Sequence, residues 1–129
     1  MARRLISSGG PYERPNGYSR AVVVGDSCWV AGTTDAGPDG RSAHPGDAGA
    51  QARAAFAIVA DALEAAGFGL QDVVRTRMFV TEMTASAAVL AVHGGLFGEI
   101  RPAATIVEVG ALIEPSLLVE IEAEARRAG

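Results

Sequence analysis

Strict alternation of apolar and acidic residues near the C-terminus constrains the fold of this chain more than any other feature. The segment reads Val119-Glu120-Ile121-Glu122-Ala123-Glu124-Ala125. Successive side chains of a β-strand point to opposite faces, so the three glutamates share one face and the apolar residues share the other. The pattern predicts a sheet with one apolar face against a core and one face that meets water, a ligand or another subunit.

The remaining patterns predict two helices and about six strands in the order β-β-β-α-β-α-β-β. We expect helices over residues 47–66 and 84–97, the first capped by Asp47 and terminated by Gly67. The Gly25-Asp26 pair between two apolar runs is typical of a hairpin turn. Residues 9–17 and 33–46 have no periodicity and are expected to be loops, the second of them mobile. Strands are expected at residues 4–8, 18–25, 27–32, 73–81, 103–109 and 118–125.

These elements predict one α+β domain spanning residues 1–129, with a mixed sheet of about six strands and both helices on one face. The helices would leave the other face uncovered. One side of the fourth strand carries Arg75, Arg77 and Phe79, and one side of the fifth carries Ile106 and Glu108. If these sides are the uncovered ones, charge is mixed there with large apolar groups. That mixture predicts burial against other copies of the chain, and hence a homo-oligomer.

Composition narrows the classes of function. The formal net charge of −4 argues against nucleic-acid binding, which relies on Lys and Arg. No apolar run is long enough to span a bilayer, no signal peptide is evident, and cytoplasmic localisation is expected. The single cysteine, Cys28, cannot form an intrachain disulfide and is expected to be buried. His44 and His93 are distant in sequence and show no ligand spacing, so no metal site is expected.

Many local strings, in order along nearly the whole chain, resemble the RidA/YjgF family of small enamine/imine deaminases. The weakest match is the loop at residues 33–46. The strings that carry the resemblance are Gly17-Tyr18-Ser19-Arg20-Ala21, residues 22–26, Trp29-Val30-Ala31-Gly32, Gln51-Ala52-Arg53, Ala65-Ala66-Gly67, Asp72-Val73-Val74-Arg75-Thr76, Phe79-Val80-Thr81, Arg101-Pro102-Ala103, Val107-Glu108-Val109 and Val119-Glu120-Ile121-Glu122-Ala123.

The resemblance implies a chorismate-mutase-like fold and a homotrimer that binds small molecules in clefts between subunits, with no cofactor. In deaminating members a glutamate on the last strand positions the hydrolytic water, and a tyrosine and a backbone segment line the pocket. By position these correspond here to Glu120, Tyr18 and Gly32. From the residues alone, Glu120 could equally pair with an arginine at an interface, and Tyr18 could merely cap the sheet edge.

The arginine with which those members bind a substrate carboxylate has no counterpart. Its place after Pro102-Ala103 is taken by Ala104, which removes the planar fork that carboxylate recognition requires. Arg101 lies an odd number of residues away, so it is expected to face the other side, although it could bind an anion at the cleft mouth. Arg77 could reach the cleft from a neighbouring strand, and Glu108 and Glu122 are expected to pair with Arg75 and Arg77.

Two functions are consistent with these observations. The first is a cofactor-independent hydrolase or deaminase of an imine, enamine or related small substrate, with weak or absent activity on 2-imino acids because of Ala104. The second is a non-catalytic trimer that binds a small molecule or acts as a regulator. Ribonuclease activity, which has been attached to some relatives, is disfavoured by the acidic balance.

Overall fold

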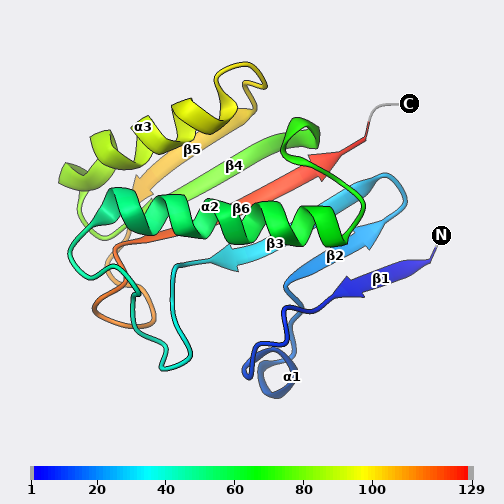
Figure 1. Cartoon of the computed structure of the whole chain (residues 1–129), viewed down its shortest axis with the longest axis horizontal. Helices are drawn as coiled ribbons and strands as arrows, with labels where there is room; N and C mark the ends of the chain where they lie inside the picture. Colours follow the sequence, from blue (N-terminus) through cyan, green and yellow to red (C-terminus); the bar gives the residue numbers. More distant parts are fainter. Residues whose placement is uncertain (1, 128–129) are drawn as a thin grey trace.

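The computed structural model describes residues 2–127 and contains one six-stranded sheet with two long helices on one face (Figure 1). The spatial order of the strands is β1-β2-β3-β6-β4-β5. Neighbours are antiparallel except β4 and β5, which run parallel. The predicted α+β class with one mixed sheet is confirmed. The strands are β1 Arg3–Ile6, β2 Ala21–Val24, β3 Ser27–Thr33, β4 Val73–Val80, β5 Ala103–Glu108 and β6 Val119–Arg126.

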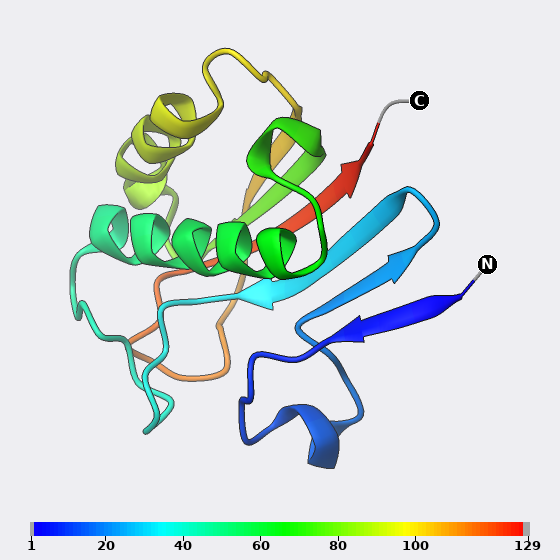
Figure 2. The same ribbon diagram turned by 45° about the vertical axis from the view of Figure 1, so that its right-hand side comes forward.

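The long helices are α2 Ala48–Ala65 and α3 Ser86–Phe97, and both lie on the same side of the sheet (Figures 1 and 2). Asp47 caps α2 as predicted, because its carboxylate accepts a hydrogen bond of 3.0 Å from the Ala50 N–H. Gly67 follows α2 with a φ of 87°, a conformation that favours glycine. Within residues 2–127 no helix combines the length and apolar character needed to cross a bilayer.

A third, four-residue helix, α1 Glu13–Asn16, lies in a segment expected to be a loop. It ends at Gly17, whose φ is 73°. Glu13 is buried and accepts hydrogen bonds from the backbone N–H and the hydroxyl of Ser8. Burial favours the neutral carboxyl, but these hydrogen bonds prevail and lower the pKa of Glu13. A helix of one turn leaves no periodic signal in the sequence, which explains why it was missed.

The segment between β3 and α2, expected to be a mobile loop, has a defined hydrogen-bond network. Ala36 and Ser42 form an isolated antiparallel bridge. The buried carboxylate of Asp35 accepts hydrogen bonds from the Ser42 hydroxyl at 2.8 Å and the His44 backbone N–H at 3.0 Å. Buried Gln51 of α2 donates to the carbonyls of His44 and Ser116 and accepts from the Leu118 N–H. Gln51 therefore ties this segment to the one that precedes β6.

The two faces of the sheet differ as the alternation in β6 predicts. The four apolar residues of that pattern are at most 2 % exposed and pack under the helices, whereas the three glutamates lie on the uncovered face. Arg75, Arg77 and Phe79 of β4 lie opposite these glutamates and share the uncovered face. The core includes Phe56 and Leu63 from α2, and it contains Cys28 as expected.

The prediction for the fifth strand needs correction. Ile106 lies beside Met78 and packs against the core, so it faces the helices rather than the uncovered face. Glu108 lies on the same side and accepts a hydrogen bond of 2.8 Å from the Met83 N–H, instead of pairing with an arginine. The helices cover the edge strand β5 only in part, so most of its residues remain exposed. The sequence of such a strand does not indicate which of its sides faces the helices.

Candidate functional site

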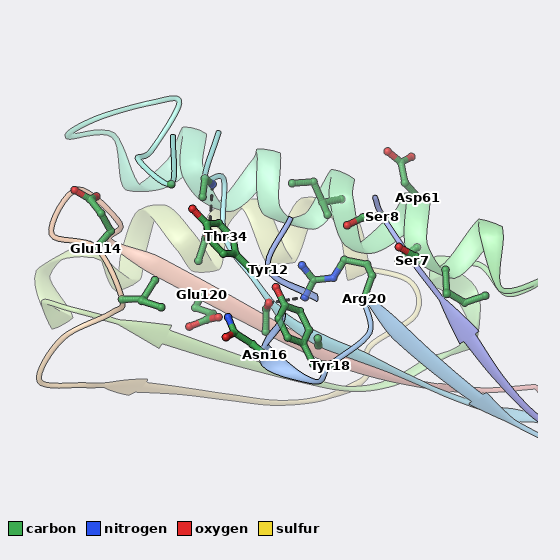
Figure 3. Close-up of a pocket in the computed structure, with 18 of the residues that line it drawn as sticks. Ser7, Ser8, Tyr12, Asn16, Tyr18, Arg20, Thr34, Asp61, Glu114 and Glu120 are labelled. Atoms are coloured by element: carbon green, nitrogen blue, oxygen red, sulfur yellow. Dashed lines mark hydrogen bonds between the residues drawn. The ribbon is translucent and has the colours of Figure 1, made fainter. Parts of the chain in front are cut away.

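A cavity of about 1240 Å³ lies where the C-terminal end of β3 meets β1, α1, α2 and the segment before β6. Its walls combine polar side chains with apolar residues of α2 such as Ile58 and Ala62. Three residues proposed from the sequence, Tyr18, Gly32 and Glu120, line this one cavity. Figure 3 shows Glu120 on β6 and Tyr18 on the segment before β2 approaching the same space from two sides.

A β-bulge in β3 places Gly32 beside Glu120. Val30 pairs with Ala123 and Thr33 with Ile121, so β3 has one residue more than β6 between these pairs. Because of this extra residue, Val30 and Thr33 are both buried although they are three positions apart. A Cβ atom on Gly32 would lie 2.5 Å from Oε2 of Glu120. The close approach of the carboxylate to the backbone therefore requires glycine at position 32.

The environment of Glu120 raises the proton affinity of its carboxylate. Burial raises the pKa of Glu120, and the nearby Glu122 carboxylate raises it further, while the positive charge of Arg20 acts in the opposite direction. The cause is mainly desolvation, because the side chain lies against the bulge rather than in open water. A carboxylate with increased proton affinity beside a cavity is suited to accept a proton from a bound water.

Arg20, to which sequence reasoning assigned no role, is the cationic side chain at the cavity wall. Its Nη2 atom donates a hydrogen bond of 2.6 Å to the carbonyl oxygen of Gly32 (Figure 3). Its Nε atom is buried and has no hydrogen-bond partner among residues 2–127. Arg20 falls inside a string that carries the family resemblance, but the resemblance implied no function for it, and neither periodicity nor a motif distinguished it.

The tyrosines of the cavity depend on a local structure that the sequence did not reveal. Tyr18 directly follows the left-handed Gly17 that ends α1, and the residue is 44 % exposed. Tyr12 is the residue just before α1 and Asn16 is the last residue of that helix, and both also line the cavity. In Figure 3 Asn16 and Tyr18 lie close together, while Tyr12 lies nearer Thr34.

The other residues proposed for substrate binding do not line this cavity. Arg77 lies on the uncovered face, 2.8 Å from a Glu124 oxygen and 3.7 Å from a Glu122 oxygen. Arg101 occupies the turn before β5 with a φ of 56°, and its backbone N–H bonds to Phe97. Ala104 lies on edge strand β5, and two strands, β6 and β4, separate it from β3. The proposed pairing of Arg77 with Glu122 is present, together with the closer contact to Glu124.

The histidines have separate structural surroundings. His93 packs against Phe56 and Phe97 and shares a hydrogen bond of 2.8 Å with Thr76, and burial lowers its pKa. The His44 ring lies 3.1 Å from the Asp35 carboxylate. In residues 2–127 no group of three His, Cys, Asp or Glu side chains is arranged to hold a metal ion.

Comparison with known proteins assigns the chain to a family. The family model described as Endoribonuclease L-PSP matches residues 12–127. The crystal structure of Rv2704 from Mycobacterium tuberculosis, a member of the YjgF/YER057c/UK114 family, superposes with a TM-score of 0.88 at 47% identity, covering 98% of this chain and 100% of that one. The YjgF gene product of E. coli superposes with a TM-score of 0.78 at 32% identity, covering 96% and 94% of the two chains.

A curated sequence from Pyrococcus horikoshii, a RutC family protein, is 34% identical over 108 residues, covering 84% of this chain and 85% of its own length. The residues matched by the family model include β3 and β6, the strands that carry Gly32 and Glu120. The chain therefore belongs to the YjgF/RidA family.

Proposed function

We propose that this protein hydrolyses an imine or enamine, or a related small substrate, at the cavity formed by Tyr18, Gly32 and Glu120. The observation that supports this most is the position of Glu120, a carboxylate of raised pKa that lies at the cavity wall against a glycine. Burial increases its affinity for a proton, and the cavity leaves room for water and a small molecule beside it.

In this reaction the oxygen of a water molecule bonds to the imine carbon while Glu120 accepts one of the water protons. The C=N double bond becomes a single bond in the tetrahedral adduct, and its nitrogen takes up a proton from solvent. Glu120 then returns its proton to this nitrogen, and the C–N bond breaks with its electron pair leaving on ammonia. The adduct hydroxyl loses its proton to solvent and becomes the carbonyl oxygen of the product. The Tyr18 hydroxyl lines the same cavity and can orient the water or the substrate by hydrogen bonding.

Ala104 restricts the substrate. Its methyl group stands where the deaminating members that this chain resembles have an arginine. A charge-assisted hydrogen bond to the substrate, worth about 1.5–3 kcal/mol, is therefore lost. That energy corresponds to about one to two decades in affinity. We therefore propose reduced or absent hydrolysis of 2-imino acids, whose carboxylate adjoins the reacting carbon. The preferred substrate lacks that carboxylate or has it bound by another group.

The cavity is proposed to be completed by a second copy of the chain in a homotrimer. Phe79 is only partly buried and Trp29 and Val107 are 45 % and 40 % exposed, and these apolar groups are interspersed with charges on the uncovered face. Within one chain, Ala104 lies too far across the sheet to contact the cavity, because each intervening strand adds about 4.8 Å. Size-exclusion chromatography with light scattering tests the assembly, and a monomer at micromolar concentration would refute it.

Ammonia release tests the reaction. Imines are generated in situ, 2-imino acids with an amino-acid oxidase and neutral imines with an amine oxidase, and ammonia is measured with and without the protein. We expect release from 2-imino acids well below that of an arginine-bearing relative. Equal rates for the two proteins on 2-imino acids would show that the interpretation of Ala104 is wrong.

An engineered arginine provides a second test. Ala104→Arg is expected to raise the rate on 2-imino acids by about one to two decades, because Ala104 is exposed and an arginine can extend from it. Ala103→Arg is the matched control, since its side chain lies on the other face of β5. An equal gain in both variants would point to a non-specific charge effect and argue against the proposed site.

The alternative is a non-catalytic trimer that binds or responds to a small molecule in the same cavity. It is supported by the absence of an arginine at position 104, which weakens the catalytic case. A thermal shift with a ligand, no turnover of any imine and no effect of Glu120→Gln on a reaction would favour this alternative over hydrolysis.

A further inference from the structure

The chain carries an arginine inside the cavity whose hydrogen-bonding capacity is largely unused. A guanidinium has five N–H donors and is always charged. Within residues 2–127, the side chain of Arg20 makes one hydrogen bond, from Nη2 to Gly32, and its Nε has no partner. No carboxylate of these residues lies within 4.0 Å of the Arg20 guanidinium. Glu120 lies near enough to feel the charge of Arg20 but does not form an ion pair with it. A partly buried guanidinium with unpaired donors is a place where an anion is expected to bind.

The free edge of the guanidinium fits a carboxylate. Nη1 donates to no group of residues 2–127 and is not enclosed as Nε is, and Nη2 has a second hydrogen beyond the one shared with Gly32. These two nitrogens form the end-on fork that can donate two parallel hydrogen bonds to the oxygens of one carboxylate. In Figure 3 the guanidinium of Arg20 extends toward the space between Tyr12, Tyr18 and Glu120.

We propose that Arg20 is the specificity-determining residue that recognises the carboxylate of a small acid in this cavity. The inference rests on the proposed function, which identifies this cavity as the substrate site. It assigns to Arg20 the binding of a substrate carboxylate, which Ala104 cannot provide. The carboxylate would be held by a residue that directly precedes β2 rather than by one on β5. Its distance from the reacting carbon therefore differs from that in relatives that bind it through the arginine on β5.

The other charges of the cavity limit the ligand to a single carboxylate. Besides Glu120, three carboxylates of residues 2–127 line the cavity, those of Asp39, Asp61 and Glu114. Asp39 and Asp61 are exposed, so water and salt screen their charges, and Glu114 already accepts hydrogen bonds from the backbone N–H and hydroxyl of Ser116. These carboxylates disfavour polyanions such as nucleotides and nucleic acids. A small acid whose remainder is neutral or positively charged can pair with Arg20 without being repelled by these carboxylates.

The structure also allows a simpler role, in which Arg20 only supports the bulge through the Gly32 carbonyl. The two roles differ in how they depend on ligand charge. Recognition by Arg20 requires a charged ligand, whereas damage to the bulge would weaken binding of charged and neutral ligands alike. Pyruvate and its neutral amide, pyruvamide, have nearly the same shape and differ in this charge, so the pair separates the two roles.

The test is calorimetric or NMR-detected binding of pyruvate and pyruvamide to the full chain and its Arg20→Gln variant. The wild-type protein is expected to prefer pyruvate, and Arg20→Gln to weaken pyruvate binding by about 10- to 100-fold while changing pyruvamide binding less than about threefold. Arg20→Lys keeps the charge without the fork and should retain part of the preference. Arg53→Gln, an exposed arginine of α2 outside the cavity, is the matched control and should leave both affinities unchanged.

Equal weakening of both ligands by Arg20→Gln, or a wild-type preference for pyruvamide, would overturn the proposal. If Arg20→Gln does not fold, Arg20→Lys and the wild-type preference decide the question, together with the loss of that preference at high salt. Binding is measured without turnover. A protein that selects pyruvate but hydrolyses no imine would refute the proposed function and support this inference. A protein that hydrolyses neutral imines but does not bind pyruvate more tightly than pyruvamide would support the proposed function and refute this inference.

Discussion

Glu120 and Glu124 lie on the same face of the same strand, four residues apart, yet their surroundings differ. Glu124 lies 2.8 Å from the Arg77 guanidinium on the uncovered face. Glu120 lies against the bulge of β3 with its carboxylate beside Gly32, and no Lys or Arg of residues 2–127 comes within 4.0 Å of it. The position of a glutamate in the alternating strand thus determines which face of the sheet its carboxylate occupies. The neighbouring strand determines whether that carboxylate pairs with an arginine or remains unpaired beside the cavity.

The largest difference between the two glutamates is expected in catalysis. Glu120→Gln should lower the rate of imine hydrolysis by about 10²- to 10⁴-fold, because an amide cannot accept a proton from the attacking water. Glu124→Gln is the isosteric control and should change the rate by less than about threefold, since Glu124 does not line the cavity. Ammonia release under saturating substrate measures both. A larger loss in Glu124→Gln than in Glu120→Gln would contradict the assignment.

The next effect concerns the backbone contact of Glu120. Gly32→Ala would place a Cβ atom 2.5 Å from the Glu120 carboxylate oxygen, so the carboxylate must move. We expect at least a tenfold loss of ligand binding or activity, because a displacement near 1 Å can cost about 10²-fold. Gly94→Ala in α3 is the control: its Cβ would meet no atom within 4 Å, and alanine should stabilise the helix by up to about 1 kcal/mol.

Thermal unfolding measures the stability of the two glycine variants, and titration with pyruvate measures their ligand affinity. If Gly32→Ala binds ligand like the wild type, the close approach of Glu120 to the bulge has no functional consequence.

A smaller effect is expected in the pH dependence of stability. Since the pKa of Glu120 is raised above its ordinary value near 4.5, the folded state binds more protons than the unfolded state just above that pH. The stabilising contribution of the protonated form is therefore present below pH 4.5 and is lost as the pH rises through the folded-state pKa. Relative to the wild type, Glu120→Gln should gain stability between pH 4 and pH 7.

Chemical denaturation of the wild type and Glu120→Gln at pH 4, 5, 6 and 7 measures this difference. The sign is the informative result: a gain in the relative stability of the wild type with rising pH would mean that Glu120 is stabilised in its ionised form.

The smallest effect is expected for the ion pair of Glu124. Its side chain and that of Arg77 are 33 % and 39 % exposed, so water screens their attraction. Arg77→Gln should lower the free energy of unfolding of the isolated chain by less than about 1 kcal/mol. Denaturant titration at low and high salt measures the change, with Arg41→Gln in the segment between β3 and α2 as an exposed control. A loss of several kcal/mol would indicate that the assembly buries this pair.

Much of the fold could be predicted from the sequence because its signals are local. Alternation in β6, the apolar stripe of α2 with its Asp47 cap, and the Gly25-Asp26 hairpin each follow from short-range geometry and are present in the structure. The four-residue α1 and the hydrogen-bonded segment around Asp35 left no such signal. The orientation of Ile106 was also missed, because it depends on the register of β5 against β4.

For the candidate site, the family resemblance identified Tyr18, Gly32 and Glu120, and the structure places all three at one cavity. Arg20 was not identified. Its guanidinium reaches Gly32 across 12 residues of sequence, and only the pairing of β2 with β3 brings the two together. Whether a side chain of one strand meets the backbone of another depends on register, which no single segment encodes.

The sequence by itself determined the class of fold, the face on which each residue of β6 lies, and the absence of an arginine at position 104. These properties are set by the chemical identity of the residues and by the two-residue period of a strand. Only the tertiary structure decided that β3 contains a bulge, that Gly32 contacts Glu120, and that Arg20 has donors free beside the cavity. The physical reason is that desolvation and unsatisfied hydrogen bonds arise from contacts between segments that are distant in sequence.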